Sequence, residues 1–351
     1  MFKRAIKLKS YATEAKQNKV LALISRYRCQ VNMFIDYIWN NKETAKLDAK
    51  TLKSIDKVQD LSERYKSNAL KQALQICKSE KNKSKPDFNG YPVLDAKFVS
   101  IDTNKSSKEF DLWIKLSTLK SGRRIEIPTK KHAHLNKWLK TGTLIQGCEL
   151  RPDGFIVWVE ANPPEKKNSL KVGVDIGMNK LLTTSYGEKL GTDFNRINDK
   201  ILRKKKNSKN YKRAIAEKKN YINQSVNLLP WTEMEVLCYE NIKNLKKGST
   251  KRNKQTRQKQ QHWSYRQVIE AMKMKAQANR VSLVYVNPAY TSQKCSACGN
   301  IAASSRYLEN YCCISCGHTQ DADVNAAKNI LHKGLDWITS LESVKSKSAI
   351  I

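Results

Sequence analysis

The chain has 351 residues, which is enough for roughly two domains with a sizeable core and excludes a peptide or a small stapled scaffold. Its 66 lysines and arginines outnumber 32 aspartates and glutamates, and the resulting net charge of +34 predicts a polyanionic partner, for which nucleic acid is the obvious candidate. A hydrophobic content of 40%, with only 13 glycines and 8 prolines, excludes a disordered basic tail or a collagen-like chain.

No apolar run in the sequence approaches the roughly 20 residues that a membrane span needs, and the first ten residues lack a signal-peptide core. We therefore expect a cytoplasmic, nucleoid-associated protein. A basic membrane-surface protein is the competing interpretation. The excess charge, however, is spread over the whole chain instead of lying on one amphipathic helix.

The N-terminal half predicts a small β domain beside or around a helical segment. An alternating strand opens the chain. Apolar residues then recur at helical spacing over 18–40, and a second helical stretch covers 51–81. Short alternating segments separated by polar turns predict further strands, at 97–101, 110–116, 123–128, 142–150 and 154–160.

A polar, proline-containing linker at 161–169 precedes a change of character, and we place the main domain boundary there. Beyond it the pattern predicts strand, strand, helix, strand, helix, strand, helix. The first of these helices is a Lys- and Arg-rich one from about Asn198 to Asn223. The tract 241–261 contains no acid, and we expect it to contact a phosphate backbone.

Three acids stand at the ends of apolar strands or at the start of a helix: Asp175, Glu240 and Asp323. Rigid carboxylates at the rim of a sheet suit phosphodiester hydrolysis, because two magnesium ions about 3.5–4 Å apart require hard oxygen ligands. Each acid alone is more often a cap or turn residue. Asp321 competes with Asp323 for the third position, and spacing alone does not decide between them.

A histidine-based nuclease is a weaker alternative for the same chemistry. His262, His318 and His332 are isolated in the sequence, as is typical of surface or core histidines.

Five cysteines lie in one short window near the C-terminus. Cys295 and Cys298 form one C-x-x-C pair, and Cys313 and Cys316 form a second, with a glycine directly after each pair. Two such knuckles predict a closed Cys₄ zinc site, which is structural because the protein supplies all four ligands. Cys312 is the alternative to Cys313 but breaks the two-residue spacing, and a thioredoxin-like redox site would need one pair.

The segments VGVDIG, LCYENIKNL, VNPAYTSQKCSACG and CISCGHTQDADVNAAKNIL, in this order, resemble the nuclease half of the TnpB family of RNA-guided DNA endonucleases. These transposon-encoded proteins are related to type V CRISPR effectors. The resemblance covers Lys171–Gly334. It implies an RNase H-like (RuvC) α/β domain with an inserted zinc ribbon, in which Asp175, Glu240 and Asp323 bind two magnesium ions. It also favours Asp323 over Asp321.

The same resemblance implies an α+β multidomain protein. A β-barrel-like wedge domain (1–10 and 87–164) would be interrupted by a helical recognition insert (11–86), and a nuclease domain (165–290 and 321–351) by the zinc ribbon (291–320). The expected partners are a transposon-end or CRISPR-like guide RNA and double-stranded target DNA with a short protein-read motif. The residues expected to contact nucleic acid are Ser67, Asn68, Lys71, Lys204, Lys205, Lys206, Lys251 and Arg252.

Two other functions fit parts of this pattern. A nuclease-inactive, RNA-guided DNA-binding repressor would share the scaffold but lack one acid, and all three acids are present here. A transposase that binds DNA directly also needs three acids. The zinc ribbon just before the third acid, together with the resemblance, argues against it.

Overall fold

The computed structural model describes residues 1–41, 55, 60–80, 84–105, 107–119, 124–163, 169–242 and 264–348, the last helix with side chains as far as 341. The chain divides into two compact units, Met1–Asn162 and Pro163–Ile351, each of which is an α+β structure. No helix in the described residues combines the length and apolar character needed to cross a membrane.

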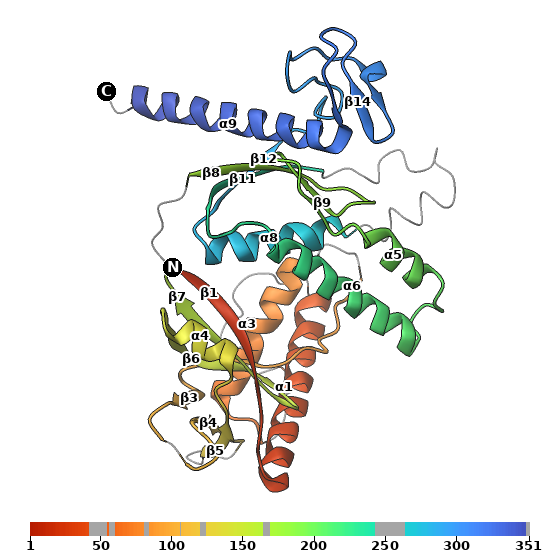
Figure 1. Cartoon of the computed structure of the whole chain (residues 1–351). Coiled ribbons are helices and arrows are strands. Elements are labelled where there is room, and N and C mark those ends of the chain that lie inside the picture. Colours follow the sequence, from red (N-terminus) through yellow and green to blue (C-terminus); the bar gives the residue numbers. More distant parts are fainter. Residues whose placement is uncertain are drawn as a thin grey trace. The chain divides into compact units, whose positions relative to one another are not determined.

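The first unit contains a four-stranded and a three-stranded antiparallel sheet, in the orders β1-β7-β6-β2 and β3-β4-β5 (Figure 1). Its strands are β1 (Phe2–Lys9), β2 (Val93–Asp95), β3 (Val99–Asp102), β4 (Leu112–Ser117), β5 (Arg124–Thr129), β6 (Gly142–Arg151) and β7 (Gly154–Ala161). Its helices are α1 (Glu14–Asn40), α3 (Glu63–Ser79) and α4 (Ala133–Leu139).

The opening strand, the first long helix and the five later strands predicted for this unit are confirmed, whereas helix α4 and strand β2 were not predicted. Helix α1 forms because apolar residues at helical spacing bury one stripe against the core. The predicted stretch 51–81 begins only at Glu63 among the residues described, and much of its first part lies outside them. Helix α4 and strand β2 have seven and three residues, too few for a periodic pattern to show.

The second unit is built on a five-stranded sheet in the order β10-β9-β8-β11-β12 (Figure 1). Strands β8, β11 and β12 run parallel, and β9 and β10 are antiparallel additions at one edge. The strands are β8 (Leu170–Asp175), β9 (Leu182–Thr184), β10 (Lys189–Leu190), β11 (Met234–Glu240) and β12 (Ser282–Val286). The helices are α5 (Phe194–Leu202), α6 (Lys209–Asn227), α8 (Tyr265–Ala278) and α9 (Ala322–Ser348).

Helices cover both faces of this sheet. Val172, Val174 and Leu237 face a core that they share with α6 and α8. On the opposite face Cys238 packs with β12 and with Ile330 of α9, which crosses the sheet (Figure 1). The sheet is therefore a buried middle layer, and its alternating side chains point either to α8 or to α9.

The prediction of a single helix from about Asn198 to Asn223 is wrong, because α5 ends at Leu202 and α6 begins at Lys209. Asn207 adopts a left-handed conformation with a φ of 66°. The Ser208 side chain then caps α6 by accepting a hydrogen bond from the Tyr211 amide at 3.1 Å. The Asn207-Ser208 pair is typical of a turn or a helix cap, but the lysine-rich sequence around it favoured one continuous helix.

Candidate nuclease site and zinc ribbon

The ends of β8 and β11 bring two of the predicted acids together. The strands are parallel, with Val174 opposite Tyr239, so Asp175 and Glu240 follow at the same edge of the sheet. Gly173 lies two residues before Asp175 and therefore faces the same side. A Cβ atom on Gly173 would stand 2.1 Å from the backbone oxygen of Ala327, so the glycine lets α9 cross directly over the strand.

The same alternation orients β11. Cys238 lies against Gly334 of α9, where an added Cβ would meet the Cys238 sulfur at 2.3 Å. Glu240 is two residues further along and faces α9 as well. Because α9 begins beside this edge and carries Asp323 in its first turn, the fold directs all three acids to one side of the sheet.

The ionisation of Asp175 is affected by the charges of the other two acids. The pKa of Asp175 is raised to about 7, first by burial and then by the negative charges of Glu240 and Asp323, while the charge of Arg306 opposes the rise. Burial also raises the pKa of Glu240, against a hydrogen bond from Thr291 that lowers it. A cation bound beside Asp175 would offset the burial and the neighbouring negative charges that disfavour the ionisation of this carboxyl.

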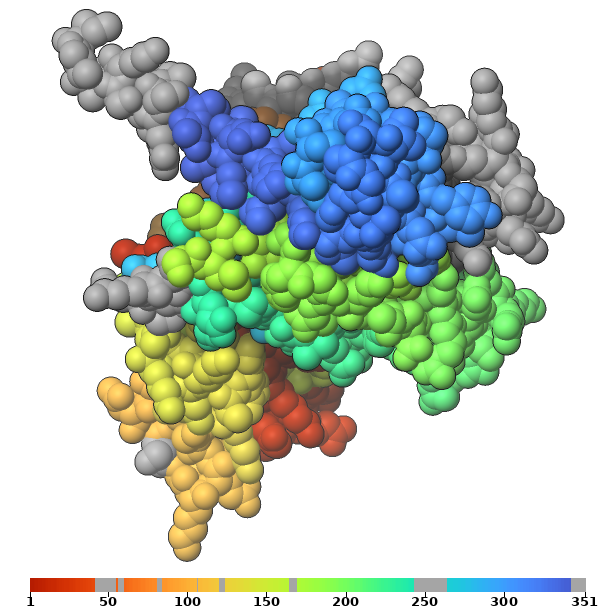
Figure 2. Space-filling view, turned by 45° about the horizontal axis from the view of Figure 1, so that its top comes forward, coloured from red at the N-terminus to blue at the C-terminus, as the bar shows by residue number. Residues whose placement is uncertain are grey.

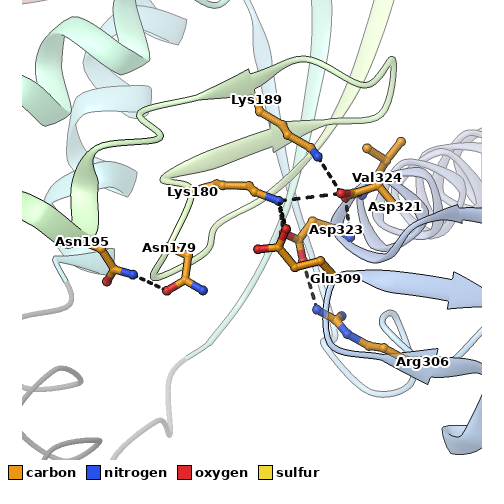
Figure 3. A network of polar contacts seen from close by, with 9 residues as sticks. All are labelled: Asn179, Lys180, Lys189, Asn195, Arg306, Glu309, Asp321, Asp323 and Val324. Atoms are coloured by element: carbon orange, nitrogen blue, oxygen red, sulfur yellow. Dashed lines mark hydrogen bonds and ion pairs between the residues drawn. The ribbon is translucent and has the colours of Figure 1, made fainter.

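Two cations already contact the third acid (Figure 3). Arg306, from strand β13 (Arg306–Tyr307) of the predicted zinc ribbon, places Nη2 3.0 Å from Oδ1 of Asp323. Lys180, from the loop after β8, places Nζ 3.9 Å from Oδ2 of Asp323 and 2.9 Å from Glu309 of the ribbon. These pairs hold the ribbon, the β8 loop and the start of α9 together around the acids, and Figure 2 shows the ribbon packed against the segment that follows β8.

Asp321 has a different role from its neighbour. Its Oδ1 accepts hydrogen bonds from the amides of Asp323 and Val324 at 3.0 and 3.2 Å, which is the geometry of a helix N-cap. Its Oδ2 lies 2.6 Å from Nζ of Lys189 in β10 (Figure 3). Nζ of Lys180 lies 3.7 Å from the same oxygen, so the carboxylate of Asp321 is occupied by the cap and two ion pairs.

The ribbon brings four cysteines into one cluster, and its strands β13 (Arg306–Tyr307), β14 (Asn310–Cys312) and β15 (Thr319–Asp321) form a small antiparallel sheet. The ligand atoms of Cys295, Cys298, Cys313 and Cys316 all lie within 4.8 Å of one another. Within the described residues, these four cysteines are the group of His, Cys, Asp or Glu side chains that lie close enough together to hold one ion.

The cluster fits zinc. The Cys295–Cys316 and Cys298–Cys313 sulfur distances are 3.8 and 3.6 Å. A tetrahedral site with zinc–sulfur bonds of about 2.3 Å requires sulfurs about 3.8 Å apart. A hydrogen bond from the backbone amide of Cys316 lowers the pKa of Cys313, whereas the neighbouring sulfurs raise the pKa of Cys316, so the four thiols ionise as a coupled group. Cys312 is exposed and is not in the cluster.

The knuckles need their glycines. Gly299 and Gly317 have φ values of 81° and 70°, in the left-handed region, and their amides donate to the carbonyls of Cys295 and Cys313. This is the tight turn that each C-x-x-C-G sequence predicts.

The predicted nucleic-acid contacts on α3 fall partly in a cavity. Asn68 and Lys71 line a cavity of ≈ 430 Å³ with Gln72, Gln75 and Trp158. Asn68 already donates hydrogen bonds to Tyr27 and to the Val93 carbonyl, both at 3.0 Å. Ser67 is exposed on α3 and does not line this cavity.

The predicted basic contacts of the second unit lie between α5 and α6. Lys204, Lys205 and Lys206 are exposed in the turn that joins the two helices. Lys204 also lines a cavity of ≈ 380 Å³ with Arg196, Asp199, Lys200 and Arg203. Lys251 and Arg252 lie outside the described residues.

Parts of the chain are similar in sequence to known proteins. A family model for the Cas12f1-like TNB domain matches residues 265–330. The CRISPR-associated endodeoxyribonuclease Cas12f1 of Sulfoacidibacillus thermotolerans is 37% identical over 86 residues, which are 24% of this chain and 20% of that protein. A TnpB-like protein of Aquifex aeolicus is 33% identical over 99 residues, which are 27% of this chain and 31% of that protein.

The C-terminal half of the chain is therefore similar to TnpB- and Cas12f1-type proteins. A solved structure of a Cas12f1–sgRNA–target DNA complex supports the fold, with a TM-score of 0.51 at 14% identity over 90% of this chain and 82% of that one. The matched segments span less than a third of each of these two relatives' own lengths.

Sequence reasoning missed three residues that the structure places at the acids: Lys180, Thr291 and Arg306. Thr291 lies in the N-P-A-Y-T-S block that carries part of the resemblance, so it could have been singled out. Arg306 lies in the stretch between the two cysteine pairs, where nothing in the pattern indicated its direction.

Proposed function

We propose that this protein is an RNA-guided DNA endonuclease. Asp175, Glu240 and Asp323 would hold two magnesium ions that hydrolyse phosphodiester bonds. The observation that carries the proposal is the approach of three acids at one edge of a sheet, in a chain of net charge +34.

The strand order supports an RNase H-like fold for the second unit. Three parallel strands extended by two antiparallel ones, with α9 across the catalytic face, are what the resemblance to the TnpB family implies. The division of the first unit into a wedge (1–10 and 87–164) and a recognition insert (11–86) stays a prediction, as does the boundary of the zinc ribbon (291–320).

The residues divide the chemistry between them. Magnesium bound by these acids would supply Lewis acidity to the phosphodiester. The three carboxylates orient the metal, and buried strands hold Asp175 and Glu240 rigid. Arg306 and Lys180 add positive charge beside Asp323, where a phosphate of the scissile strand would lie.

Specificity would come from base pairing. The relatives' names include an endodeoxyribonuclease, and the similar structure is titled as a complex with sgRNA and target DNA. A guide RNA would pair with the target strand while lysines and arginines hold the backbone. The cavity at Asn68, Lys71, Gln72 and Gln75 offers amide and ammonium groups that suit the edges of bases in the short motif beside the target.

The test compares cleavage of one plasmid by the protein alone, with its native RNA and with an RNA whose targeting segment is changed. We expect no specific cut without RNA and a moved cut with the altered RNA, provided that the short motif flanks the new site. Identical cut sites in all three reactions would refute RNA guidance and favour a transposase that reads DNA directly.

A further inference from the structure

Thr291 connects the zinc ribbon to one of the three acids. It lies between β12 and Cys295 and is 2% exposed. Its hydroxyl contacts Oε1 of Glu240 and also lies 2.9 Å from the carbonyl oxygen of Pro288. A hydroxyl has one proton, and an ionised carboxylate is the stronger acceptor, so the hydrogen bond goes to Glu240 whenever that acid is charged.

Two buried asparagines of α9 hold Thr291 in place. Asn329 is 1% exposed, and its Nδ2 donates to the carbonyl oxygens of Thr291 at 2.9 Å and Lys294 at 2.6 Å. Asn325, one turn earlier, donates to the Lys294 carbonyl at 2.8 Å and accepts from the Ser296 amide at 2.9 Å. Residues four apart share a helix face, so the pair clamps the segment from Thr291 to the first zinc knuckle.

We propose that Thr291 is a positioning residue for Glu240, and that Asn329 and Asn325 link it to the zinc ribbon. The proposal rests on the proposed function. Thr291 engages Oε1 and thereby leaves Oε2 of Glu240 for a metal ion. The ribbon then supports the catalytic site through a chain of contacts that ends on a carboxylate: zinc knuckle, asparagine clamp, threonine hydroxyl, Glu240.

The experiment compares Thr291→Val, which keeps the shape but removes the hydroxyl, with Thr291→Ser, which keeps the hydroxyl. The first readout is direct binding of Mn²⁺, used as a probe for Mg²⁺ and followed by electron paramagnetic resonance. The second is the Mg²⁺ concentration for half-maximal cleavage by the guide complex. Outer hydrogen-bond partners of metal ligands typically change affinity or activity by about 10–100-fold.

We expect Thr291→Val to weaken Mn²⁺ binding and raise the Mg²⁺ requirement about tenfold or more, and Thr291→Ser to stay within about threefold of the wild type. Zinc content should remain one per chain in all three proteins. Equal metal dependence of Thr291→Val and the wild type would overturn the proposal. If the wild type bound Mn²⁺ but cut nothing with any guide, the proposed function would fail separately.

Asn329→Ala tests the link to the ribbon. If Asn329 acts through Thr291, the double variant with Thr291→Val should bind Mn²⁺ no more weakly than the weaker single variant. The zinc content of each variant checks that the ribbon is still folded. Fully additive losses in zinc-loaded protein would refute the link between these two residues.

Discussion

Replacing Asp175 by asparagine should stabilise the metal-free protein and abolish cleavage. Asn has nearly the shape of Asp, and its side-chain oxygen can still accept the hydrogen bond from the Ile176 amide. What it loses is the negative charge, which burial and the charges of Glu240 and Asp323 make unfavourable in the absence of a cation. The same loss removes a ligand from the proposed magnesium site.

The pKa of Asp175 gives the size of the effect. A rise from 3.8 to about 7 corresponds to roughly 4 kcal/mol, at 1.36 kcal/mol for each tenfold change in proton affinity. Because Asp175 is only half-buried, we expect Asp175→Asn to raise the free energy of unfolding by about 2–4 kcal/mol. For a unit of this size that is a rise in Tm of roughly 5–15 °C.

The dependence on pH has a definite sign. Between pH 3.8 and about 7 the folded protein keeps a proton on Asp175 that the unfolded chain has released. The unfolding free energy of the wild type therefore falls as pH rises through this window and levels off above it. Asp175→Asn lacks this slope, so the two proteins should differ most at pH 8 and converge near pH 4.

The assay is thermal unfolding from pH 4 to pH 8 in magnesium-free buffer without chelators, so that zinc stays bound. Hydrogen exchange in β8 and β11 locates the change. Asp336→Asn, an exposed acid of α9, is the matched control and should shift stability by less than about 0.5 kcal/mol. Added Mg²⁺ should stabilise the wild type only. An Asp175→Asn protein that melts at or below the wild type at pH 8 would refute the reasoning.

Three further predictions concern the ribbon and the start of α9. Cys316→Ser should lose the zinc and Cys312→Ser should keep it, as measured by elemental analysis, and the reverse result would exchange their assignments. Asp323→Ala should abolish cleavage. Asp321→Ala should lose a helix cap, which costs about 1 kcal/mol of stability, and should slow cleavage only partly. An inactive Asp321→Ala variant beside an active Asp323→Ala variant would contradict this assignment. Gly173→Ala should destabilise the protein to urea by about 1–3 kcal/mol, since its Cβ would stand 2.1 Å from the α9 backbone, and an unchanged midpoint would mean that the helix can move away.

Strands β8 and β11 could be predicted from the sequence because each is an apolar run that ends in an acid. The zinc cluster could be predicted because its ligands come in two local pairs at fixed spacing. The choice between Asp321 and Asp323 could not be made from spacing, since both stand at the start of one helix. The resemblance favoured Asp323, and the cap formed by the Asp321 side chain agrees with that choice.

The contacts that orient the acids could not be predicted from the sequence, because they join residues that are far apart in the chain. Thr291 and Glu240 are 51 positions apart and meet only because β11, β12 and α9 pack together. Arg306 reaches Asp323 across the ribbon's small sheet. Neither contact leaves a periodic signal, because each depends on where a loop ends after the sheet has formed.

The position of the ribbon immediately before α9 has a consequence for the acids. Ala322 is fully buried with Cys295, Tyr311 and Cys313 in the ribbon's small core, and its amide donates to the Glu309 carbonyl at 2.8 Å. The next residue along the chain is Asp323. The first turn of α9 is thus fixed from the ribbon side, while the middle of the helix is fixed by its close approach to β8 and β11. Loss of zinc should therefore disturb Asp323 before it disturbs the sheet that carries the other two acids.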